Sequence, residues 1–162
     1  MPKILAGEAN SPGYFAKRTL DNLSSLDKSD AELFSKLAVF TWVIGTPFPL
    51  ILNVNDAVFE DAGITFPVLN HLDDIGLITF ENISGFRCLR LSQKINVQYF
   101  VSVISLELPQ EKDNHVEVGK VLFTQVGIQL LQVCSVARSE KFFEYILARW
   151  ADVGYLPSSP LR

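Results

Sequence analysis

The feature that most constrains the fold is a stretch of 19 residues, from Leu37 to Asn55, that carries no charged side chain. Its length is close to the roughly 20 apolar residues with which a helix spans a membrane. Gly45, Pro47 and Pro49 interrupt the middle of the stretch, however, and would break a spanning helix at a depth where no water satisfies the freed backbone groups. The stretch therefore predicts the end of one buried helix followed by one buried strand, and no membrane segment.

The composition is that of a globular chain that can bury a core. Apolar residues make up 48% and charged residues 20% of the 162 residues, a balance too apolar for a disordered chain. The length fits one compact domain with helical flanks. Because the net charge is -4, the chain as a whole has no attraction to nucleic acid or to anionic lipid, and such binding would need a local basic patch.

Cysteine usage and the N-terminal sequence predict a cytoplasmic protein. Cys88 and Cys134 are far apart and form no CxxC pair, which fits a reducing compartment. The residues from Met1 to Glu8 lack the apolar run of about 7 to 15 residues that a secretory signal needs.

Capping and breaking residues divide the middle of the chain into short helices and strands. Asp27 or Ser29 can cap a helix whose apolar positions follow the 3.6-residue period. Thr65 can cap a later helix that Gly76 ends, and residues 82–85 suit a hairpin turn. The predicted elements are a helix at 30–42, a strand at 50–54, helices at 57–62 and 66–75, and strands at 77–81 and 86–91.

This order of helix, strand, helix, helix, strand and strand is that of a winged helix. Helix 66–75 would take the position of the recognition helix, and residues 77–91 would form the wing. The predicted fold class is α+β, with a winged-helix-like unit, N-terminal helices, extra antiparallel strands and C-terminal helices.

The rest of the chain is expected to add elements around this unit. Two further strands are predicted at 95–108 and 116–123, followed by helices capped by Thr124 and Ser139. The predicted organisation is an N-terminal helical segment at 1–26, the winged-helix-like unit at 27–94, a strand pair with C-terminal helices at 95–156, and a disordered tail at 157–162.

Charge argues against the usual ligand of a winged helix, because Lys and Arg contacts to phosphate supply most sequence-independent affinity for DNA. Residues 37–86 contain no Lys or Arg. They contain six carboxylates, those of Asp56, Glu60, Asp61, Asp73, Asp74 and Glu81. Only Arg87, Arg90 and Lys94, on the second wing strand, are placed to meet phosphate, and such cations more often form an ordinary solvated surface. Nucleic acid is therefore the alternative partner, and packing against another protein is favoured.

Signals for catalysis are weak. No nucleotide-binding, hydrolase or metal-binding motif occurs in the sequence, so we predict no cofactor, no metal site and no catalytic residue. His71 and Asp74 would lie on one face of a helix, which is how a base oriented by a carboxylate begins. No nucleophile or third ligand accompanies them, and such a pair is more often a surface hydrogen bond.

The last predicted helix carries aromatic residues on more than one face. One helix buries a single face in its own domain, so Phe143, Tyr145 and Trp150 are candidates for an interface. The alternative, which we weigh equally, is that strands 95–108 and 116–123 cover both sides of the helix.

A further indication comes from blocks of sequence spread along the chain. These blocks are Lys3-Ile4-Leu5-Ala6-Gly7-Glu8, Ser11-Pro12-Gly13, Asp30-Ala31-Glu32-Leu33-Phe34, His71 to Ile78, Val121 to Gly127 and Phe142-Phe143-Glu144-Tyr145. Together they resemble a bacterial domain-of-unknown-function family over nearly the whole chain. The resemblance implies no reaction and no catalytic residue. It implies that this chain corresponds to the C-terminal half of longer members, which leaves Ile4 and Leu5 available to a partner surface.

Three functional hypotheses follow. The first is a non-catalytic module that associates with itself or with another protein through apolar surfaces. The second is a DNA-binding regulator that uses Arg87, Arg90 and Lys94. The third, with the least support, is an enzyme centred on His71 and Asp74.

Overall fold

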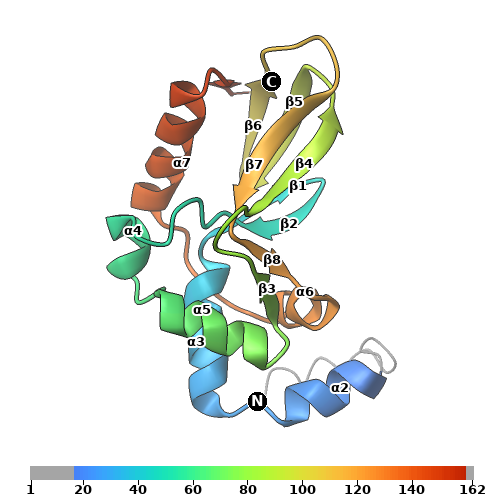
Figure 1. Ribbon diagram of the computed structural model, residues 1–162, viewed down its shortest axis with the longest axis vertical. Helices are drawn as coiled ribbons and strands as arrows, with labels where there is room; N and C mark the ends of the chain where they lie inside the picture. Colours follow the sequence, from blue (N-terminus) through green and yellow to red (C-terminus); the bar gives the residue numbers. More distant parts are fainter. Residues whose placement is uncertain (1–16, 160–162) are drawn as a thin grey trace.

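The computed structural model describes residues 17–159, which form a mixed α/β fold with antiparallel sheets (Figure 1). The helices are α2 (Lys17–Ser24), α3 (Lys28–Ala38), α4 (Ala57–Glu60), α5 (Phe66–Asp74), α6 (Gln125–Leu131) and α7 (Glu140–Asp152). The strands are β1 (Thr41–Ile44), β2 (Thr46–Pro49), β3 (Ile78–Phe80), β4 (Phe86–Leu91), β5 (Lys94–Tyr99), β6 (Ser102–Glu107), β7 (Asn114–Gly119), β8 (Val121–Phe123) and β9 (Leu156–Ser158). Helices α2, α3, α5 and α6 gather at one end of the molecule, and the longer strands lie at the other end with α7 (Figure 1).

Three helices begin where the sequence places a capping residue. The Asp27 carboxylate accepts a hydrogen bond from the Asp30 N–H at 2.9 Å, and the Asp30 carboxylate accepts one from the Asp27 N–H at 3.3 Å. Thr124 and Ser139 each accept from the backbone N–H three residues on, at 3.1 Å. These side chains satisfy N–H groups that a helix start leaves free, and the predicted caps of α3, α6 and α7 are confirmed.

The uncharged stretch after α3 forms a β-hairpin where the sequence predicts a longer helix. Strands β1 and β2 pair around Gly45, whose φ of +75° glycine adopts without steric cost. Trp42 and Ile44 are buried while Val43 between them is exposed, which is the alternation of a strand. The prediction of a helix up to Trp42 is wrong because β-branched and aromatic residues here bury better on a sheet than on a helix.

Five strands form one sheet, in the order β2-β1-β5-β6-β9, with every neighbouring pair antiparallel. The single strand predicted at 95–108 is wrong, because β5 and β6 are separated by a tight turn at Phe100 and Val101. In this turn Phe100 adopts a φ of +52°, a conformation that usually requires glycine. The turn therefore contains no glycine or proline by which it could be predicted from the sequence. Strand β9 includes Pro157 and Ser158, which therefore do not belong to a disordered tail.

The predicted hairpin wing is wrong, because β3 and β4 do not pair with each other. Strand β3 pairs with β8, and β4 pairs with β7, so residues 78–91 run antiparallel to residues 114–123. Residues 81–85 leave this ribbon as a loop, and the specific winged-helix arrangement is not confirmed. The strand predicted at 50–54 is reduced to one bridge, between Ile51 and Gly119. Strands from the segments predicted as 27–94 and 95–156 thus pair with one another.

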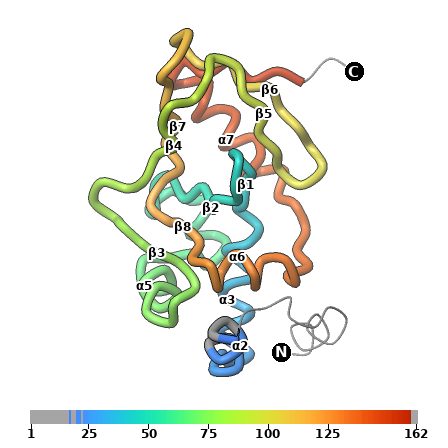
Figure 2. Tube along the Cα trace, turned by 90° about the vertical axis from the view of Figure 1, so that its right-hand side faces the viewer, coloured from blue at the N-terminus to red at the C-terminus, as the bar shows by residue number. Residues whose placement is uncertain are grey.

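The buried apolar residues form one core, which extends from the helical end of the molecule into the space between the sheet, the ribbon and α7. The ribbon strands β4 and β7 lie on one side of the core, the strands β5 and β6 lie on the other, and α7 closes the space between them (Figure 2). Trp42 stands near its centre, with ring centroids 5.1 Å from Tyr99, 5.7 Å from Phe143 and 4.9 Å from Trp150. The five-stranded sheet therefore buries one face and turns the other away from the core.

Candidate interaction surface

The face of the five-stranded sheet that points away from the core is the candidate interaction surface, which we call the outer face. Residues that lie opposite one another on neighbouring strands form three rows across this face. The rows are Val43, Gln98 and Val103; Asn96, Ser105 and Ser158; and Lys94, Glu107 and Leu156. The first two rows carry no charge, and the only charged side chains of these rows, Lys94 and Glu107, stand opposite each other at one end.

Exposure differs sharply between the two faces of this sheet. On the inner face, Trp42, Val97 and Leu106 are at most 1% exposed. On the outer face, Val43 is 37% and Val103 is 39% exposed, and Leu156 is 61% exposed. Val101, in the turn next to the first row, is 89% exposed. Apolar side chains from three strands and one turn thus remain partly exposed on the same face of the sheet.

Proline protects both edges of the sheet. The edge strand β2 contains Pro47 and Pro49, and the edge strand β9 contains Pro157. Proline has no backbone N–H and cannot donate to an added strand. Edge-to-edge pairing with another chain is therefore disfavoured, and the outer face is the more accessible route for association.

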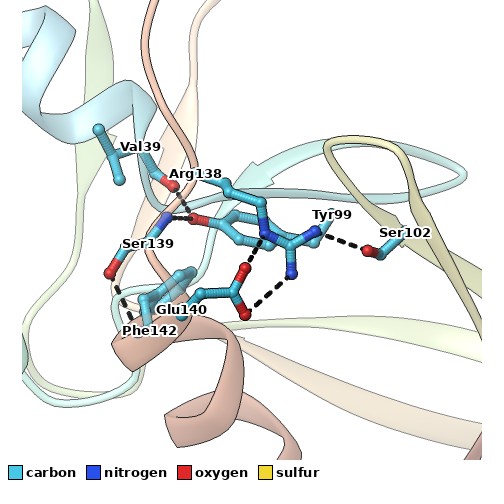
Figure 3. Close-up of polar contacts among 7 residues, drawn as sticks. All are labelled: Val39, Tyr99, Ser102, Arg138, Ser139, Glu140 and Phe142. Carbon is cyan, nitrogen blue, oxygen red and sulfur yellow. Dashed lines mark hydrogen bonds and ion pairs between the residues drawn. The ribbon is translucent and has the colours of Figure 1, made fainter.

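The Tyr99 side chain, at the end of β5, ties the β5–β6 hairpin to two helices (Figure 3). Its hydroxyl donates to the Val39 carbonyl, which follows α3, at 2.7 Å. The same hydroxyl accepts from the Ser139 N–H, at the start of α7, at 3.0 Å. Burial raises the pKa of Tyr99, so the hydroxyl keeps the proton that it donates. This network holds the sheet at a fixed angle to α3 and α7.

Arg138 reinforces the same junction from the side of the hairpin turn (Figure 3). Its guanidinium donates to the Ser102 hydroxyl at 2.6 Å and forms an ion pair with Glu140 at 2.5 Å. The guanidinium carbon also lies 4.8 Å from the ring centre of Phe143 and 5.5 Å from that of Tyr99. Contacts of this kind to aromatic faces stabilise a partly buried cation.

The predicted interface residues of α7 make their contacts inside the chain. Trp150 is 2% exposed and lies edge-on to Trp42. Phe143 is half-buried and stacks parallel to Trp42. The Tyr145 hydroxyl donates to Asp56 at 2.5 Å, and burial together with this carboxylate raises the pKa of Tyr145. These contacts favour the interpretation in which the core takes up the aromatic residues.

The three candidate nucleic-acid contacts are exposed but belong to two separate layers. Arg87 and Arg90 lie on β4 in the ribbon, whereas Lys94 begins β5 in the sheet. The Arg87 guanidinium lies 4.0 Å from the carboxylate of Glu117 on β7. Lys94 stands opposite Glu107 on β6. Acidic neighbours therefore offset two of the three cations, and the three form no stripe along one strand.

The structure gives His71 a different carboxylate from the one predicted. The imidazole Nε2 lies 2.6 Å from the Asp30 carboxylate on α3, and the His71 side chain is 46% exposed. Asp74 is exposed, and the neighbouring Asp73 accepts a hydrogen bond from the Phe80 N–H. The His71–Asp30 contact joins α5 to the start of α3.

Apart from Lys94, which was predicted as a nucleic-acid contact, the residues of the outer face were not among those predicted from the sequence. The alternation of residues 95–99 and 102–107 carried a signal, but Thr41 and Trp42, the first half of the partner strand β1, were predicted as the end of a helix. Without β1, the row that joins Val43, Gln98 and Val103 cannot be assembled. The other predicted interface residues, Ile4 and Leu5, lie outside the described residues.

Fold and surface together define a small mixed α/β domain with one open sheet face. A sequence profile for a family described as a protein of unknown function, DUF2806, matches residues 2–147, so the chain belongs to this family. No curated protein and no solved structure matches the chain. Among residues 17–159, no helix has both the length and the hydropathy to cross a bilayer. The same residues hold no group of three or more His, Cys, Asp and Glu side chains suited to a metal ion.

Proposed function

We propose that the chain is a non-catalytic interaction module that associates with a second copy of itself through the outer face. The observation that carries this proposal is the uncharged pair of rows in which Val43 and Val103 stay exposed. Burying such side chains against an equivalent surface removes apolar area from water, which is the main driving force for association.

Charge supports a second copy as the occupant. In a two-fold contact, each surface meets itself, so a surface of one sign would repel its partner. The outer face avoids this, because Lys94 and Glu107 balance each other and the other two rows are neutral. The net charge of -4 is therefore carried elsewhere on the chain and does not oppose face-to-face packing.

Nucleic acid and catalysis have less support. In the winged-helix comparison α5 takes the place of the recognition helix, and it carries Asp73 and Asp74 but no Lys or Arg. Of the two arginines on β4, Arg87 lies 4.0 Å from Glu117 across the ribbon. The carboxylate partner of His71 lies on α3, so the contact links two helices.

The test is the molar mass of the chain in solution, measured by size-exclusion chromatography with light scattering over a dilution series. The wild-type chain is expected to approach twice 18.1 kDa as concentration rises. The double variant Val43→Lys with Val103→Lys places two like charges in the centre of the contact, and is expected to remain a monomer.

The matched control is Ile83→Lys with Leu89→Lys, which changes two exposed apolar residues outside the outer face. This control is expected to dimerise like the wild type. A wild-type chain that stays monomeric at every concentration would overturn the proposal, as would a dimer that Val43→Lys with Val103→Lys leaves intact. Salt-sensitive binding to a DNA duplex, lost in Arg87→Ala with Arg90→Ala, would support the nucleic-acid alternative instead.

A further inference from the structure

A cavity of about 350 Å³ lies on the side of the molecule away from the outer face, between the C-terminal end of α7 and the end of β7. Leu52, Trp150 and Val153 supply apolar wall, and Tyr155 closes one side. This volume falls in the range of small-molecule sites, which combine mostly apolar walls with a few polar groups.

Four charged side chains line the same cavity, two of each sign: Glu117, Lys120, Arg149 and Asp152. Within the described part of the chain, no ion pair joins any two of them. Three of the four have partners outside the cavity: the Lys120 ammonium donates to the Ile83 carbonyl at 3.3 Å, Glu117 is 4.0 Å from Arg87, and Arg149 is 3.8 Å from Asp56. These contacts are long and partly exposed, and such contacts are weak, so a ligand that carries both signs can compete with them for the four groups.

The backbone that forms the inner end of the cavity is fixed before any ligand arrives. Gly119 has φ of +93°, and a Cβ at this position would lie 2.3 Å from the Ile51 carbonyl oxygen. The next N–H, that of Lys120, donates to the same carbonyl at 2.9 Å. Only glycine permits this approach, and it sets the direction in which Lys120 leaves the strand. The backbone of this wall of the cavity is therefore held in place without a ligand, and ordering it adds no cost to binding.

We propose that this cavity binds a free α-amino acid with an apolar side chain. Lys120 and Arg149 match the carboxylate, since an ammonium and a guanidinium both form charge-assisted hydrogen bonds to it. Glu117 and Asp152 match the α-ammonium group. The apolar wall at Leu52 and Val153 receives the side chain.

The experiment is an NMR titration of the ¹⁵N-labelled full chain with L-leucine, followed by backbone amide shifts. Saturable shifts are expected at Lys120, Asp152 and Val153. N-acetyl-leucine lacks the ammonium and leucinamide lacks the carboxylate, and each is expected to bind at least about tenfold more weakly, the loss for one charge-assisted hydrogen bond. Lys120→Met and Asp152→Asn are expected to weaken leucine binding by a similar factor.

The matched control is Lys141→Met with Asp61→Asn, which removes one exposed cation and one exposed anion at another place on the surface. This control should bind leucine like the wild type. The proposal is overturned if leucine causes no saturable shifts at the cavity, if leucinamide or N-acetyl-leucine binds as well as leucine, or if Lys120→Met and Asp152→Asn leave the affinity unchanged.

Discussion

At the scale of single residues, one glycine in α6 shows how closely the helical end of the molecule is packed. Gly127 has ordinary helical geometry, yet a Cβ there would lie 2.1 Å from the Leu77 carbonyl oxygen. In an open helix, Gly→Ala stabilises by about 0.5 to 1 kcal/mol. We expect Gly127→Ala to have the opposite sign and to destabilise the protein by about 1 to 3 kcal/mol, because the backbone of residue 77 must move.

The free energy of unfolding from urea titrations measures this effect. The sign alone decides the outcome, since a Gly127→Ala variant more stable than the wild type would mean that α6 does not lie against Leu77. Gly45→Ala serves as a comparison, because its Cβ meets nothing within 4 Å and only the positive φ opposes it.

Asp27 gives the molecule a stability term that depends on pH. The hydrogen bond from the Asp30 N–H lowers the pKa of Asp27 below its ordinary value of 3.8. A carboxylate with a depressed pKa stabilises the fold above the pKa that it has when unfolded, and the contribution is lost as pH falls through the folded value. Asp27→Ala is therefore expected to lower the Tm at pH 7, and the difference from the wild type should shrink below pH 4. Melting curves that differ equally at pH 7 and pH 3 would argue against the capping role.

At the scale of elements, the Tyr99 hydroxyl joins a hairpin to two helices through two hydrogen bonds. Tyr99→Phe would leave the Val39 carbonyl and the Ser139 N–H without this partner, and we expect a loss of about 1 to 3 kcal/mol. Tyr155→Phe removes a hydroxyl that makes one bond, to the His115 carbonyl, and is expected to cost less. Thermal denaturation followed by circular dichroism compares the two variants, and equal losses would contradict the assignment of Tyr99 as the junction.

Features that depend on neighbouring residues, such as helix caps, were predicted from the sequence. Features that depend on residues far along the chain, such as strand pairing, were not. The caps at Asp27, Thr124 and Ser139 each bind the N–H three residues further along the chain, so a short stretch of sequence is enough to predict them. Strand pairing depends on residues far along the chain. Strand β4 does not pair with β3, which precedes it in the sequence, but with residues 114–119. This pairing depends on which apolar faces meet in the core.

At the scale of the whole molecule, the candidate surface could not be predicted because it is assembled from four strands. Val43, Gln98, Val103 and Leu156 become neighbours only when β1, β5, β6 and β9 are in register. The aromatic residues of α7 were predicted as the interface instead, because the pattern along a single helix does not show which of its aromatic residues are buried. Phe143 and Trp150 are buried by contacts with Trp42. These contacts could not be predicted, because Trp42 was expected to lie on a helix.

The contact between Trp42 and Trp150 has a consequence for synthesis in the cell. The two residues are 108 positions apart, so a ribosome adding about 5 to 20 residues per second needs on the order of ten seconds to make the second after the first. During this interval the nascent β1–β2 hairpin has no helix to cover its tryptophan. Apolar surface that stays exposed on a nascent chain is prone to aggregation, and Trp42 can be covered only after α7 has been synthesised.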